Sequence, residues 1–132
     1  MKALATRVLQ DVETGAELVV SMAAPEEMSD GVWQCRFCLA EPGVVAVEER
    51  GMGSDAFQAL ALALEGIRVR LSERSRSLTW LGMEPGLTGF HRVNYAFGRK
   101  IVDELEAHID RRLEEYAAEC AAGLHGRPFG AP

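Results

Sequence analysis

The spacing of apolar residues changes near residue 55, and this change is the strongest constraint on the fold. Before it, apolar and polar residues alternate, most clearly in the run 32–39, one face of which carries Trp33, Cys35, Phe37 and Leu39. Alternation with a period of two is typical of a strand with one buried face. After it, apolar residues recur every three or four positions, as on one side of an α-helix. The pattern therefore predicts an α+β fold in which strands precede helices.

Turn signals divide the first half of the chain into strands. Alternating runs at 4–12, 17–22, 32–39 and 44–48 are separated by turns or loops that contain glycine or proline. Short connections of this kind join antiparallel strands. A short strand is also expected at 77–81. We therefore expect a four- or five-stranded, mainly antiparallel sheet with two helices packed on one face.

Two helices are predicted in the second half. The first covers about 55–73 and begins at a sequence that resembles a capping box, Asp55 followed by Gln58, with Ser54 as the alternative N-cap. Its expected buried stripe consists of Phe57, Leu60, Leu64, Ile67 and Leu71. The second helix covers 98–122, with Gly123 as its C-cap. Its stripe consists of Val102, Leu105, Ile109, Leu113, Tyr116 and Cys120. We expect Phe37, Leu64 and Leu105 to be almost fully buried. Residues 1–122 should form one domain, followed by a flexible tail at 123–132.

Three short sequence motifs lie in the predicted strands and the first predicted helix. They are Trp33-x-Cys35, Asp55-x-x-Gln58-Ala59-Leu60 and Trp80-Leu81-Gly82. In combination they resemble a family of small bacterial domains of unknown function, over about residues 32–90. The resemblance implies the order strand, strand, helix, strand, and it brings no catalytic residue. The long helix after Gly98 departs from the shorter members of that family.

Composition excludes several classes of protein. The chain has 132 residues, a net charge of −6 and no apolar run long enough to cross a membrane. An acidic chain of this kind is a poor binder of nucleic acid, because phosphate contacts need clustered lysine and arginine. Three cysteines, an odd number, and the absence of a secretory signal at the start predict a cytoplasmic protein.

Motifs that resemble catalytic or cofactor sites have simpler interpretations. Cys35 and Cys38 lie in a predicted strand, where positions three apart point to opposite faces, so we interpret them as packing residues. The stretch 51–55 (Gly-Met-Gly-Ser-Asp) lacks the lysine of a phosphate-binding loop and is interpreted as a turn with an N-cap. We therefore predict no metal, no cofactor and no catalytic residue, and we expect that the protein is not an enzyme.

Two surfaces are candidates for partner binding. Leu62 and Val69 project away from the expected stripe of the first helix, so either the last helix or a second chain should cover them. The last helix carries an acidic stripe on one flank: Asp103, Glu106, Asp110 and Glu114. This stripe is either a solvated face or a recognition surface for a basic partner.

These features predict a non-enzymatic, acidic protein-binding domain. An immunity or antitoxin protein that neutralises a basic bacterial toxin is one form of it. The alternative is a homo-oligomeric structural or assembly module that binds another copy of itself. A third class is a small ligand-binding domain or enzyme that uses the loop at 82–97, which has weak periodicity and is long for a compact domain.

Overall fold

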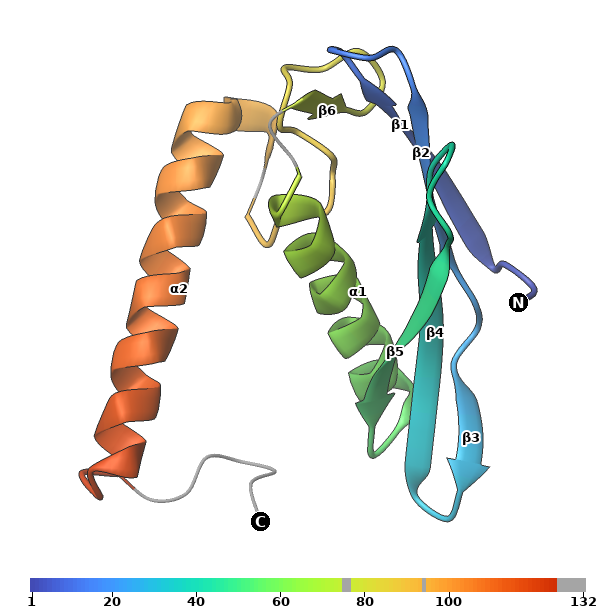
Figure 1. Cartoon of the computed structure of the whole chain (residues 1–132). Coiled ribbons are helices and arrows are strands. Elements are labelled where there is room, and N and C mark those ends of the chain that lie inside the picture. Colours follow the sequence, from blue (N-terminus) through green and yellow to red (C-terminus); the bar gives the residue numbers. More distant parts are fainter. Residues whose placement is uncertain (75–76, 94, 126–132) are drawn as a thin grey trace. The chain divides into compact units, whose positions relative to one another are not determined.

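The computed structural model describes residues 1–74, 77–93 and 95–125 (Figure 1). By its internal contacts the chain divides into two compact units, unit 1 (Met1–His91) and unit 2 (Arg92–Pro132). The elements of unit 1 are β1 (Ala5–Asp11), β2 (Glu17–Met22), β3 (Glu26–Ser29), β4 (Val32–Ala40), β5 (Val47–Gly53), α1 (Ala56–Ser72) and β6 (Leu78–Thr79). Unit 2 contains a 3-10 turn, η2 (Tyr95–Phe97), and the helix α2 (Arg99–Ala121). No helix in the described part of the chain is long and apolar enough to cross a membrane.

The described strands of unit 1 form a six-stranded antiparallel sheet, which confirms the predicted α+β class. Across the sheet the strands follow the order β5-β4-β2-β1-β6. β3 pairs with residues 32–34 of β4, on the same edge of β4 that pairs with β2 at residues 37–40. Two differences from the predicted strands were found. β3 lies inside the expected loop at 24–31, where four exposed residues give no alternation to detect. β5 begins at Val47 and continues to Gly53, whereas the predicted strand covered 44–48.

Alternation along the strands places the core on one face of the sheet. Val20 lies opposite Leu39 and Met22 opposite Phe37, so these side chains share that face. α1 packs against β4 and β5 (Figure 1). The core consists of Leu9, Leu18, Val20, Cys35, Phe37, Ala59, Ala63, Ile67, Leu71 and Leu78. The predicted burial of Phe37 is confirmed, with 4% of its surface exposed.

The predicted buried stripe of α1 is only partly correct. The residues of α1 that face the sheet are Ala59, Ala63, Ile67 and Leu71. Leu64 and Phe57, which were expected in the core, are exposed, and 40% of Leu64 is accessible. Compared with the predicted face, the helix is rotated so that Ala59 and Ala63 point at the sheet together with Ile67 and Leu71, whereas Phe57 and Leu64 do not.

Two strand glycines explain this rotation. A Cβ atom at Gly51 would lie 2.6 Å from the Ala59 carbonyl oxygen, and one at Gly53 would lie 2.6 Å from the Ala59 nitrogen. The backbones of β5 and α1 therefore approach so closely that only small residues fit between them. The prediction of a turn at 51–55 was therefore wrong for Gly51 and Gly53, because both residues belong to β5. The predicted N-cap is confirmed, since Asp55 Oδ1 accepts a hydrogen bond of 2.7 Å from the Gln58 backbone N–H.

Arg7 on β1 binds the segment that follows β6. The Arg7 guanidinium lies 3.7 Å from the centre of the Trp80 ring and 4.5 Å from that of Phe90. Its Nη1 donates a hydrogen bond of 3.2 Å to the Thr88 carbonyl. Cation–π contacts of this kind stabilise by roughly 0.5–2 kcal/mol each. The start of the predicted 82–97 loop is therefore held against β1, and both tryptophans, Trp80 and Trp33, pack against the core.

Unit 2 consists mainly of α2, which confirms the predicted second helix. The helix ends in a turn in which the Leu124 N–H donates to the Glu119 carbonyl at 3.0 Å and Gly123 has a φ of 78°. This is the C-cap predicted at Gly123. The rest of the predicted tail, 126–132, lies outside the described residues.

Candidate protein-interaction site

The apolar stripe of α2 is the first candidate surface. Of the stripe residues, Val102 is buried, but Leu105 is 43% and Leu113 58% exposed. The predicted burial of Leu105 is therefore wrong. Among the described residues of unit 2, the three-residue turn η2 is the element that packs on α2, and it is too short to cover six turns of helix. The described part of unit 2 thus leaves most of this face uncovered by its own elements.

The acidic stripe on the flank of α2 is partly engaged within unit 2. The Arg92 backbone N–H and its Nε each donate a hydrogen bond of 2.7 Å to the Glu106 carboxylate. Arg92 Nη2 lies 2.8 Å from Asp110 Oδ1. The two carboxylates therefore hold the segment that leads into α2, and their charge is partly neutralised by one guanidinium.

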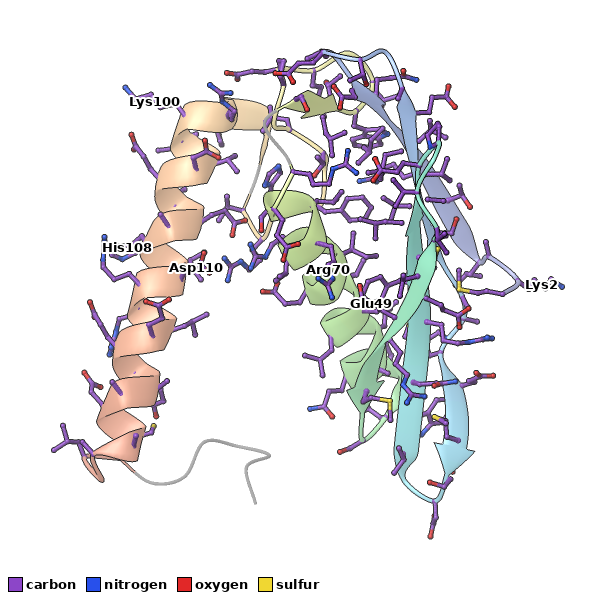
Figure 2. All side chains as sticks on the ribbon, in the orientation of Figure 1. Lys2, Glu49, Arg70, Lys100, His108 and Asp110 are labelled. Atoms are coloured by element: carbon purple, nitrogen blue, oxygen red, sulfur yellow. The ribbon has the colours of Figure 1, made fainter. Side chains whose placement is uncertain are left out.

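The other members of the stripe differ in their surroundings. Glu114 is exposed, and Asp103 is partly buried. Figure 2 shows Asp110 and His108 projecting from opposite sides of α2, so the acidic flank is distinct from the side that carries His108. Recognition of a basic partner by this stripe stays a prediction, with Glu114 and Asp110 its exposed carboxylates.

The second candidate surface is the flank of α1 that carries Leu62 and Val69. These side chains are 46% and 42% exposed. Beside them, Arg70 reaches from α1 to Glu49 on β5, with Nε 2.8 Å from Oε2 (Figure 2). The hydrogen bond from Arg70 lowers the pKa of the Glu49 carboxyl, so Glu49 stays ionised well below neutral pH. The predicted partner residues therefore form two separate sets, one on each unit.

The cysteines take the places predicted from strand geometry. Cys35 is buried on the core face, where its thiol donates to the Ala23 carbonyl at 3.4 Å, and burial raises its pKa. Cys38 lies on the opposite face and is partly exposed. The two thiols therefore cannot point at a common ion. In the described part of the chain no three His, Cys, Asp or Glu residues are grouped as metal ligands.

A shallow groove lies beside the segment at 80–91. It has a volume of about 200 Å³ and is lined mainly by apolar residues of β1, β2 and α1, among them Ala5, Met22 and Leu64, together with Arg7 and Phe90. His91 accepts a hydrogen bond of 3.4 Å from the Thr88 N–H, which ties it to its own loop. The groove is small beside typical ligand cavities of about 300–1,000 Å³.

Sequence reasoning missed two features of these surfaces. Nothing near Arg92 in the sequence indicates that it binds Glu106 and Asp110. The exposed outer edge of β5 was also missed, although the spacing of Gly51 and Gly53 is a signal for close approach of a helix to a strand.

Comparison with known families agrees with the division of the chain. The family model described as "Domain of unknown function (DUF6968)" matches residues 5–92. The chain belongs to the DUF6968 family. This confirms the resemblance to a small domain of unknown function. No curated protein and no solved structure matches the chain.

The DUF6968 match ends where unit 1 ends. The last matched residue is 92, and unit 1 ends at His91. All of α2 therefore lies beyond the matched residues. Unit 1 is the DUF6968 domain, and α2 is a helix that follows it.

Proposed function

We propose that this chain is a cytoplasmic protein-binding domain that contacts its partner through the apolar stripe of α2. The observation that carries the proposal is the exposure of Leu105, Leu113 and Tyr116 on α2, on which η2 is the element that packs among the described residues of unit 2. An amphipathic helix is stable in water chiefly when its apolar face is buried. Binding is thus the role that the stripe supports, and we propose no catalysis.

The dimensions of the stripe suit a protein partner. From Val102 to Cys120 it extends for about 27 Å at 1.5 Å per residue. Helices of this kind bind in apolar grooves through side chains three and four positions apart.

Charge indicates the chemistry of the partner. α2 contains four basic residues and seven acidic ones, which gives 4 − 7 = −3 with its histidine neutral. We propose a partner with an apolar groove and a basic rim, which Glu114 and the other acidic residues of the flank would orient. If the partner is a basic toxin, this chain acts as an immunity or antitoxin protein.

The test compares two double variants in affinity capture from the native host, with mass spectrometry of the captured proteins. Leu105→Ser with Leu113→Ser removes the centre of the stripe, whereas Ala107→Ser with Ala118→Ser changes the opposite side of α2. We expect the first variant to lose the partner and the second to keep it. The free chain should keep its Tm in both, because exposed sites usually tolerate substitution within about 0.5 kcal/mol.

Two results would contradict the proposal. One is capture of the same proteins by the stripe variant as by the unchanged chain. The other is a fall of several degrees in the Tm of the free stripe variant only, because the stripe would then belong to the protein's own core.

A further inference from the structure

The outer edge of β5 is a long strand edge. β5 pairs with β4 through seven residue pairs, from Trp33–Gly53 to Leu39–Val47, with no shift in register. In the described part of the chain no strand pairs with the other side of β5. Such an edge presents a row of N–H and C=O groups that can pair with another strand.

The other edges of the sheet differ from β5 in ways that hinder pairing. β3 has four residues and its register shifts between Glu27 and Ser29. β6 has two residues. Short or irregular edges are the usual protection against strand addition. β5 has seven residues and contains no proline, and the protection that its own sequence carries is its charge.

These charges are complementary in one self-pairing register. Glu48 and Arg50 share the face of the sheet opposite to the core, because Cys38 and Arg36 are their partners on β4. Antiparallel pairing of two β5 strands about Glu49 puts Glu48 opposite Arg50 of the second copy, and Arg50 opposite its Glu48. Two ion pairs then form by symmetry.

The neighbouring registers lack this match. Pairing about Glu48 or about Arg50 puts like charges directly opposite each other, which is destabilising. In the register about Glu49, the two Glu49 side chains meet on the core face, but each is already bound by its own Arg70, at 2.8 Å. On that face Val47 lies opposite Gly51 of the second copy, which carries no side chain.

The flank of α1 above this edge is apolar. Gly51 lies beneath Leu62 and Ala63, so α1 runs over β5. Leu64 lines the groove together with residues of β1 and β2. The flank of α1 that carries Leu64 therefore lies toward β1 and β2, away from the outer edge of β5. Since Leu62 and Val69 project from the other flank, they lie on the side of the outer β5 edge, where they are half-exposed.

We infer that the DUF6968 domain of this chain binds a second copy of itself through the outer edge of β5, in the register about Glu49. The two sheets then form one continuous sheet, and Leu62 and Val69 of the two copies face each other above the joint. This inference concerns unit 1 and goes beyond the proposed role of α2.

The test uses charge exchange in the full chain, with masses measured by sedimentation equilibrium. Glu48→Arg puts arginine opposite arginine in both cross-strand pairs, and Arg50→Glu puts glutamate opposite glutamate. We expect the unchanged chain to dimerise and each variant alone to dimerise about tenfold or more weakly. An equimolar mixture of the two variants should recover dimers, because each arginine then meets a glutamate.

A second variant keeps the inference testable if the charge variants fold poorly. Val69→Asp changes an exposed helix position and should also weaken the dimer, while Ala61→Asp on the exposed side of α1 should not. A monomeric unchanged chain would overturn the inference. So would single charge variants that dimerise like the unchanged chain, or a dimer that Leu105→Ser with Leu113→Ser abolishes while the charge variants leave it intact.

Discussion

Ile67→Ala is expected to lower the free energy of unfolding by about 2–5 kcal/mol, the usual range for truncating a buried aliphatic side chain. Ile67 is 1% exposed and lies in the core between α1 and the sheet. Out of a typical stability of about 5–15 kcal/mol, this is a large loss. Denaturant unfolding followed by circular dichroism measures it directly.

Leu64→Ala is the matched control, because it makes a similar truncation on the same helix. Leu64 is 40% exposed, so its truncation should cost about 1 kcal/mol. Equal losses for the two variants would mean that α1 buries the stripe predicted from the sequence and not the face that carries Ala59 and Ala63.

Gly51→Ala is expected to destabilise the chain by about 3 kcal/mol or more, although it adds a single carbon atom. The new Cβ would lie 2.6 Å from the Ala59 carbonyl oxygen and 2.8 Å from the Leu62 carbonyl carbon. These are backbone atoms of α1, so the whole helix has to move away from β5. Overpacking of this kind typically costs about 1–3 kcal/mol and more where backbone must shift.

Gly43→Ala separates crowding from backbone conformation. Gly43 has a φ of 76° and no atom within 4 Å of the added Cβ, so its replacement costs only the backbone strain, about 1 kcal/mol. We expect Gly51→Ala to be the more damaging of the two by at least about 2 kcal/mol. A smaller loss at Gly51 than at Gly43 would contradict the close contact of α1 with β5.

Local patterns were sufficient to predict most of the elements. The alternation of Trp33, Cys35, Phe37 and Leu39 identified both the strand and its buried face. The Asp55 cap and Gly123 marked the start of α1 and the end of α2. Each of these signals lies within a few residues of the structure that it specifies, so a single sequence contains it.

The rest depends on contacts between distant residues. The buried face of α1 is set by Gly51 and Gly53 of β5, and a stripe of larger residues, such as Leu64, was therefore the wrong guide. The engagement of Glu106 and Asp110 by Arg92 joins residues 14 and 18 positions apart. Neither the buried face of α1 nor these contacts of Arg92 follow from a local sequence pattern. The ion pairs of the acidic stripe could therefore not be predicted from the sequence.

Amide hydrogen exchange of the free chain, resolved by residue, tests most directly whether the stripe of α2 is available to a partner. We expect the amides of α2 around Leu105 and Leu113 to exchange orders of magnitude faster than those of β4, because a helix without a packed face opens locally. Adding the captured partner should then slow exchange in α2 and leave β4 unchanged. Protection of α2 equal to that of β4 in the free chain would show that the stripe is already buried, and would contradict the proposed function.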